Sequence, residues 1–179
     1  MTQLDILTEL SKGDYEAFLY DCDGTLADNM QAHKDTYVKV AADHGIEIDD
    51  AIIDEFAGLP IPRVIEEINK RYNCDFDPQT FEKLKYDLYY NEYIQHIKPV
   101  QHVADHLLAH AEKLKIGVVS GGSPEAIRKT LVAMATMALL HWCNTVCRSA
   151  GSVVRKPLAI GVCRCGAYLL VSAGPDAWR

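Results

Sequence analysis

An apolar run that ends in two closely spaced carboxylates is the feature of this sequence that most limits its fold. Residues 17–20 (Ala-Phe-Leu-Tyr) lead directly into the string DCDGTLAD, which begins at Asp21. A buried strand of an open α/β sheet delivers such side chains to its C-terminal edge, where these sheets bind ligands. Side chains alternate along a strand, so Asp21 and Asp23 would point the same way if the strand continued, and a turn at Gly24 lets them converge. Two clustered carboxylates are costly without a cation between them, and an oxygen-only cluster suits Mg²⁺.

The segment after this strand predicts an all-helical insert. Residues 33–96 lack the alternation of strands, and loops are expected at 58–62, with Pro62 opening a helix, and at 73–78. Two helical apolar faces are expected to point inward, one formed by Val64, Ile65, Ile68 and Tyr72 and the other by Phe81, Leu84 and Leu88.

Beyond Pro99 the sequence returns to an α/β pattern. A helix is expected with Val103, Leu107 and Leu114 facing inward, followed by a second buried strand over residues 115–120. The residues Ser-Pro-Glu at 123–125 are an N-cap, a helix-opening proline and a first-turn acid, which predict a helix running to Met134. The predicted order is therefore strand, helical insert, helix, strand, helix.

The string DCDGTLAD resembles the first motif of the haloacid dehalogenase superfamily of phosphatases and phosphomutases, and the element order resembles its β-phosphoglucomutase-like branch with a small helical cap. The resemblance covers roughly residues 15–134. It implies a Rossmann-like α/β core formed by residues 14–28 and 98–179, and a helical cap over residues 29–97. It also implies that Asp21 is the nucleophile that becomes an aspartyl-phosphate, that Asp23 is the general acid/base, and that both hold Mg²⁺, Asp23 through its backbone carbonyl.

Further residues of the same resemblance would bind the substrate. The segment Ser120-Gly121-Gly122-Ser123 looks like the second motif, in which a strand-end hydroxyl binds a phosphate oxygen, and it precedes a helix N-terminus that favours anions. Thr25 and Gly121 are expected to contact the phosphate with Ser120. Taken alone, this segment is equally typical of a flexible turn.

Two residues of the insert resemble substrate-facing cap positions. His33 lies twelve residues after Asp21, and Arg63 lies five after Gly58, a spacing closer to the sugar-phosphate phosphatases than to the mutase. A solvated helix histidine and a surface arginine are the alternatives. The usual Asp-Thr-Glu after the first motif is replaced here by Asp-Asn-Met at 28–30.

The composition changes after residue 134. Asp176 is the only acid among the last 54 residues, which contain both tryptophans and four of the six cysteines. Lys156, in Arg-Lys-Pro, is the candidate for the phosphate-neutralising lysine of the family, but the candidate strand 167–172 is followed by no acidic pair, so the Mg²⁺ site looks incomplete. We interpret residues 135–179 as translated in a shifted reading frame, or as otherwise divergent or truncated. A zinc site is the alternative, although its spacing matches no common ribbon or finger; it would use Cys143, Cys147, Cys163 and Cys165.

Composition narrows the possible partners and compartment. A net charge of −7 argues against nucleic acid and anionic membranes as partners. Residues 1–10 do not resemble a secretion signal, and the apolar run 131–142 is too short to span a bilayer. Six cysteines do not suggest a disulfide framework in a chain of this size, so a cytoplasmic location is expected. A monomer is also expected.

Three functional hypotheses follow. The first is an Mg²⁺-dependent phosphatase that hydrolyses a small phosphorylated metabolite, most simply a sugar phosphate. The second is a phosphomutase that returns the phosphoryl group to the sugar. The third is a non-catalytic or crippled relative whose tail lacks the last metal ligands.

Overall fold

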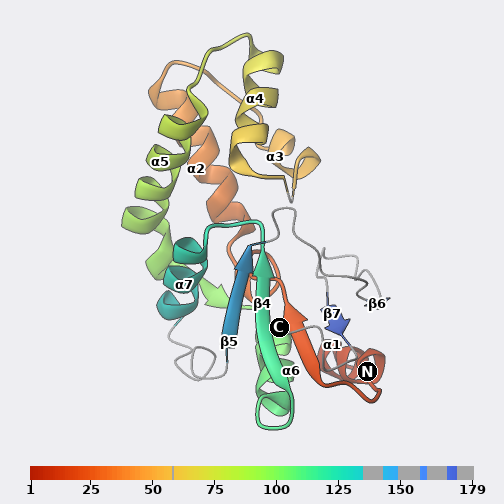
Figure 1. Cartoon of the computed structure of the whole chain (residues 1–179). Helices are drawn as coiled ribbons and strands as arrows, with labels where there is room; N and C mark the ends of the chain where they lie inside the picture. The colour runs from red at the N-terminus through yellow and green to blue at the C-terminus, as the bar shows by residue number, and fades with distance from the viewer. Residues whose placement is uncertain (58, 135–142, 149–157, 161–168, 173–179) are drawn as a thin grey trace. The chain divides into compact units, whose positions relative to one another are not determined.

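The computed structural model describes residues 1–57, 59–134, 143–148, 158–160 and 169–172. The chain separates into two compact units (Figure 1). The first comprises residues 1–28 and 97–179 and contains a five-stranded sheet, and the second comprises residues 29–96 and is helical.

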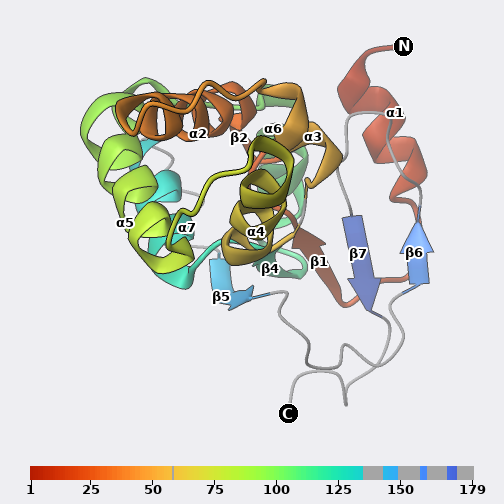
Figure 2. The same cartoon turned by 90° about the horizontal axis from the view of Figure 1, so that it is seen from above.

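The sheet of the first unit has the strand order β5-β4-β1-β7-β6, which Figure 2 shows side by side. Strand β4 pairs in parallel with both β1 and β5, whereas β7 pairs antiparallel with both β1 and β6. The helices that accompany this sheet make the unit an α/β fold, as predicted. The strand bounds are β1 Ala17–Tyr20, β4 Lys115–Ser120, β5 Cys143–Arg148, β6 Leu158–Ile160 and β7 Leu169–Ser172.

Strand β1 forms because its whole run is apolar and all four residues are buried. Its register places Tyr20 opposite Val118 of β4. Since the two strands are parallel, Asp21 and Ser120 follow at the same edge of the sheet. The predicted convergence of the two motifs at one sheet edge is therefore built into the strand pairing.

Three helices of this unit lie in the described residues. Helix α1 (Gln3–Leu10) starts with a capping box between Thr2 and Asp5. Helix α6 (Gln101–His110) ends four residues before Leu114, so the expected helical position of Leu114 is wrong, and that side chain is half-buried in the turn before β4. Helix α7 (Pro124–Ala133) begins as predicted, with the Ser123 hydroxyl accepting the Ala126 N–H. A short antiparallel pair, β2 (Ala27–Asp28) with β3 (Lys98–Pro99), completes the unit.

Between residues 33 and 96 the described part of the second unit consists of helices and connecting loops and contains no strand, as the sequence predicted. Pro62 lies in the first turn of α4, and Asp77 caps α5 through the Thr80 N–H. Its elements are α2 Met30–Asp43, α3 Ala51–Glu55, α4 Ile61–Tyr72, α5 Pro78–Leu88, a π-helical turn η1 Tyr89–Tyr93 and a 3₁₀ turn η2 Ile94–His96.

An apolar core joins these helices. Val64, Ile65 and Ile68 are buried as expected, whereas Tyr72 is half-buried and its hydroxyl accepts the Asp49 N–H at 2.8 Å. The expected inward face of α5 needs correction, because Leu84 is 36% exposed and Lys85 is buried in its place. The other buried members of this core are Tyr37, Val40, Ala41, Ile48, Ile52, Ile53 and Phe81.

No helix in the described part of the chain combines the length and the apolar character needed to cross a bilayer.

Candidate active site

The turn after β1 is organised by the backbone of Cys22. Its carbonyl oxygen accepts the N–H groups of Thr25 at 3.2 Å and of Leu26 and Ala27 at 2.9 Å each. Gly24 lies between them with a φ of 73°, in the left-handed region where a Cβ would cost energy. This tight loop folds the chain back so that Asp21 and Asp23 both remain at the end of β1.

Asp21 is held by donors on three sides. Its Oδ1 accepts the Cys22 N–H at 2.8 Å, and the Thr25 hydroxyl lies 3.5 Å from its Oδ2. Burial raises the pKa of Asp21 from 3.8 to about 6; the Asp23 charge adds to the rise, and hydrogen bonds from Cys22, Thr25 and Ser120 oppose it. The carboxylate therefore lies in a partly desolvated position whose negative charge would gain from a nearby cation.

The loop after β4 closes the other side of this site. Ser120 is 3% exposed, and its Oγ accepts the Gly122 N–H at 3.3 Å. A Cβ on Gly122 would lie 3.6 Å from Oδ2 of Asp23 and 3.0 Å from Cδ1 of Ile127. The Asp23 carboxylate therefore lies beside this loop, although the tight contact of such a Cβ would be with Ile127. The fold brings together Asp21, Asp23, Thr25 and Ser120, and Gly121 lies in the same loop as Ser120.

This arrangement is suited to phosphate chemistry. It combines a carboxylate placed at a strand end, a second carboxylate beside it, two hydroxyl groups, and a glycine loop that runs into the capped N-terminus of α7. Backbone N–H groups and a helix N-terminus favour an anion, and a carboxylate can attack phosphorus.

The sequence profile of the haloacid dehalogenase-like hydrolases matches residues 18–153, which include both loops of this site. The chain belongs to this family. Its sequence is 24% identical over 132 residues to fructose-1-phosphate phosphatase YqaB of Escherichia coli K12, covering 74% of this chain and 68% of that protein. It is also 33% identical over 63 residues to an uncharacterized protein of Haemophilus influenzae, covering 35% of this chain but only 32% of that protein's length.

Solved structures of other proteins share the fold. CbbY of Rhodobacter sphaeroides, crystallised in complex with phosphate, superposes with a TM-score of 0.64 at 17% identity, over 80% of this chain and 67% of that one. A hydrolase of Pseudomonas syringae superposes with a TM-score of 0.63 at 17% identity, over 78% and 64% of the two chains. The resemblance to this family that the first motif indicated is therefore confirmed.

His33 lies in a hydrogen-bonded network inside the helical unit. The Lys85 ammonium donates to its Nδ1 at 3.0 Å, the Asn29 amide lies 3.1 Å from its Nε2, and its ring stacks on Tyr89 at 4.6 Å. Lys85 can only donate, so Nδ1 of His33 accepts this hydrogen bond. His33 is therefore not a solvated helix histidine, and its role toward a substrate stays a prediction.

Arg63 has a different environment within the same unit. It is exposed at the start of α4, and its guanidinium pairs with Glu66 at 2.9 Å. An ion pair of this kind contributes little to stability. A substrate role for Arg63 also stays a prediction.

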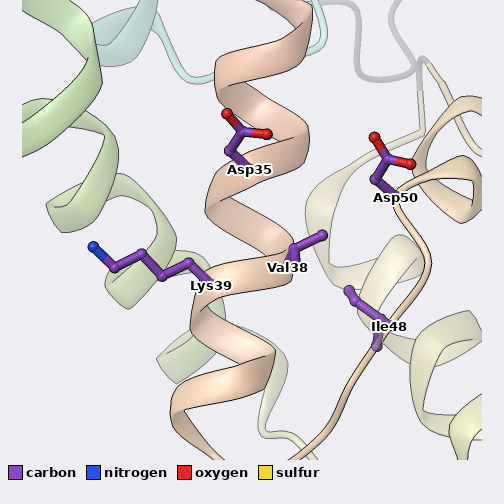
Figure 3. A pocket seen from close by; sticks show the side chains of 5 residues that line it. All are labelled: Asp35, Val38, Lys39, Ile48 and Asp50. Atoms are coloured by element: carbon purple, nitrogen blue, oxygen red, sulfur yellow. The ribbon is translucent and has the colours of Figure 1, made fainter.

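A pocket of the helical unit is formed between α2 and the segment before α3 (Figure 3). Val38 and Ile48 face each other across it, Asp35 and Asp50 add two carboxylates, and Lys39 points away. Lys39 is paired with Glu92 at 2.6 Å. Because the two carboxylates would repel an anion, this pocket does not suit a phosphate group.

The predicted tail residues divide between described and undescribed parts. The described residues do not include Lys156, Asp176, Cys163 or Cys165. For Cys143 and Cys147 the structure describes only the backbone, which belongs to strand β5. The candidate strand 167–172 is described as β7, over Leu169–Ser172. It runs antiparallel to β1, so Ser172 pairs with Ala17, at the opposite end of β1 from Asp21.

Lys85 is a buried charged residue that the sequence analysis did not predict. It is 2% exposed, and its ammonium lies over the rings of Tyr37, Tyr86 and Tyr89 at 5.2, 4.7 and 5.8 Å. A sequence signal existed, because Lys85 follows Phe81 by four residues and so falls on the same helix face. A lysine in an apolar stripe is a candidate for a buried, paired charge, and such a charge is a candidate functional group.

Proposed function

We propose that this chain is a phosphoric monoester hydrolase that transfers the phosphoryl group of a small sugar phosphate to Asp21 and then to water. The observation that carries the proposal is the meeting of the Asp21–Asp23 pair with the Ser120–Gly122 loop at one sheet edge. The named activity of the Escherichia coli relative favours a sugar 1-phosphate as substrate class.

In the first chemical step, a carboxylate oxygen of Asp21 attacks phosphorus while the bond from phosphorus to the sugar oxygen breaks. Asp23, which lies beside the glycine loop, gives its proton to the departing sugar oxygen. In the second step Asp23 takes a proton from water, the water oxygen attacks phosphorus, and the Asp21 carboxylate leaves. Splitting the displacement in this way replaces one difficult step by two easier ones.

The donor set of this site fits Mg²⁺ in part. Asp21 and Asp23 offer oxygen ligands, and Mg²⁺ readily keeps waters at its remaining positions. When bound, the ion would reduce the repulsion between the carboxylates and the phosphate. No group of three or more acidic, histidine or cysteine side chains able to hold a metal occurs among the described residues. The antiparallel direction of β7 agrees with the lack of a third acidic ligand among the described residues, because the C-terminal end of β7 lies away from Asp21. We therefore propose weak Mg²⁺ binding and slow turnover.

Residues 29–96 are proposed to act as the cap that excludes bulk water, with His33 and Arg63 contacting the sugar. Lys156 is proposed to pair with the phosphate. A cytoplasmic location is proposed as well.

A product assay tests the proposed reaction. With glucose 1-phosphate or fructose 1-phosphate and Mg²⁺, we expect release of inorganic phosphate and free sugar. Formation of glucose 6-phosphate from glucose 1-phosphate would identify a phosphomutase instead. Neither product at any Mg²⁺ concentration, from a folded protein, would favour the non-catalytic alternative.

Removal of the Ser120 hydroxyl tests the phosphate-binding loop. We expect Ser120→Ala to weaken competitive inhibition by inorganic phosphate about 10- to 100-fold, because a hydrogen bond to a charged group contributes about 1.5–3 kcal/mol. Ser120→Thr keeps the hydroxyl and is the matched control, expected to retain most of the affinity. Unchanged inhibition of Ser120→Ala would show that this loop does not bind phosphate.

A further inference from the structure

His106 joins three elements of the first unit in a buried contact. It is fully buried on α6. Its Nε2 lies 2.7 Å from Oγ of Ser11, the C-cap of α1, and its Nδ1 lies 2.9 Å from the hydroxyl of Tyr20, the last residue of β1. One imidazole thus connects α1 to the strand that ends at Asp21.

The donors and acceptors around this imidazole are all satisfied by one set of hydrogen-bond directions. The Ser11 hydroxyl has one proton, and the Thr8 carbonyl, which can only accept, lies 3.1 Å from it. If Ser11 donates to Thr8, then Nε2–H of His106 donates to Ser11 and the Tyr20 hydroxyl donates to Nδ1. Every proton is then used once, in a chain that runs from β1 through α6 to α1.

Helix α1 has few other buried attachments. Ser11 is the one buried residue among residues 1–11, all of which the structure describes. Leu4 and Leu7 are half-buried, while Ile6 and Leu10 are 45% and 54% exposed. The family match begins at residue 18, so α1 also lies outside it. An element with so little buried surface opens at low free-energy cost, and its docking depends strongly on the Ser11 contact.

We propose that neutral His106 is a latch that docks α1 on the core, and that protonation of His106 releases α1. This inference goes beyond the proposed enzymatic function. A protonated imidazole has two N–H donors and no acceptor, so Tyr20 could no longer donate to Nδ1. The resulting cation would also be buried away from bulk solvent.

Among the described residues that contact His106, none carries a compensating negative charge. From β1 it meets Tyr20 and the Phe18 ring, and from its own helix it meets His110, whose ring centroid lies 4.4 Å away. From α1 it meets the Ser11 hydroxyl, while the nearby acids of that helix, Asp5 and Glu9, are bonded to Thr2 and to Lys12.

Acidification therefore acts on the latch in a defined direction. Burial, and then the charge of His110, lower the pKa of His106 from 6.5 to about 4. A group with a lowered pKa in the docked state stabilises docking above its ordinary pKa and loses that contribution as the pH falls. Docking of α1 should thus weaken between about pH 6.5 and about pH 4.

Hydrogen exchange of the full chain, read by mass spectrometry, tests the latch. Protection of α1 amides, normalised to α7 and corrected for intrinsic exchange, should fall about tenfold from about pH 7.5 to about pH 5.5. His106→Gln, whose amide can accept from Tyr20 and donate to Ser11 but does not titrate, should keep α1 protected at both pH values. His106→Phe should leave α1 unprotected at both, and His102→Gln, on the same helix, should behave like the wild type.

Two results would overturn the proposal: α1 protection in the wild type that does not change with pH, or pH dependence that survives in His106→Gln. Nitrogen NMR of the wild-type histidines provides a test that needs no variant. It should find the proton of His106 on Nε2 at neutral pH, and a proton on Nδ1 would contradict the latch.

Discussion

Replacement of Asp21 by Asn should lower phosphatase activity by at least about a thousandfold, the scale on which enzymes lose activity with their nucleophile. The amide keeps the shape of the side chain and its Oδ1 can still accept the Cys22 N–H, but it cannot attack phosphorus. The measurement is the rate of inorganic phosphate release from the best sugar phosphate, at saturating Mg²⁺.

Stability separates this effect from unfolding. Burial disfavours the charge of Asp21, as its raised pKa shows, so Asp21→Asn should be at least as stable as the wild type in chemical denaturation at neutral pH. Asp14→Asn, an exposed change three residues before β1, is the control and should leave activity unchanged. Activity of Asp21→Asn within a few-fold of the wild type would exclude the aspartyl-phosphate mechanism.

Loss of the second carboxylate should have the next largest effect. Asp23→Asn removes the group proposed to protonate the sugar oxygen and to activate water, and general acid–base catalysis contributes about 10²–10⁴-fold. We expect turnover of a sugar phosphate to fall by about that factor. Because water is no longer activated, phosphorylated Asp21 should accumulate from a substrate whose leaving group needs no proton.

The leaving group distinguishes an acid role from a merely structural one. A nitrophenolate leaves without protonation, so formation of the phosphorylated enzyme from 4-nitrophenyl phosphate should be nearly normal in Asp23→Asn. Formation from a sugar phosphate should be strongly slowed. An equal loss with both substrates would show that Asp23 acts on binding or on the metal rather than as an acid.

The parts of the fold that were predictable are those set by local sequence. An apolar run of four residues, all buried, gave β1, and the strand at 115–120 and the Ser123 cap followed from equally local patterns. Gly24 was expected in a turn and adopts a left-handed conformation. These features depend on burial periodicity and turn chemistry, which neighbouring residues determine.

The parts that were not predictable depend on distant contacts. Ser11 and Tyr20 meet His106 across 95 and 86 residues of sequence, a pairing that no local pattern contains. The inward face of α5 was misassigned because positions three and four residues after Phe81 both fit a helical stripe, and a leucine is more often buried than a lysine. Residues 167–172 were a candidate strand, but the local sequence carries no information on the direction of β7, which is antiparallel to β1.

The reading frame of the tail can be examined directly. We interpret residues 135–179 as frame-shifted or divergent, so the nucleotide sequence around codon 134 should encode, in another frame, a Lys-Pro pair and a following acidic pair. Such a finding would explain why β7 does not bring acids to Asp21. A coding sequence with no such motif in any frame would instead favour divergence.

Trapping of the phosphorylated enzyme tests the central proposal most directly, because it needs one phosphoryl transfer and no sustained turnover. The full chain is mixed with a sugar phosphate over a range of Mg²⁺ concentrations, quenched, reduced with borohydride and digested for mass spectrometry. Reduction of an aspartyl-phosphate leaves homoserine, and we predict this product at position 21 in the wild type and its absence in Asp21→Asn. Phosphate release with no modification at position 21, or with modification of another residue, would contradict the account.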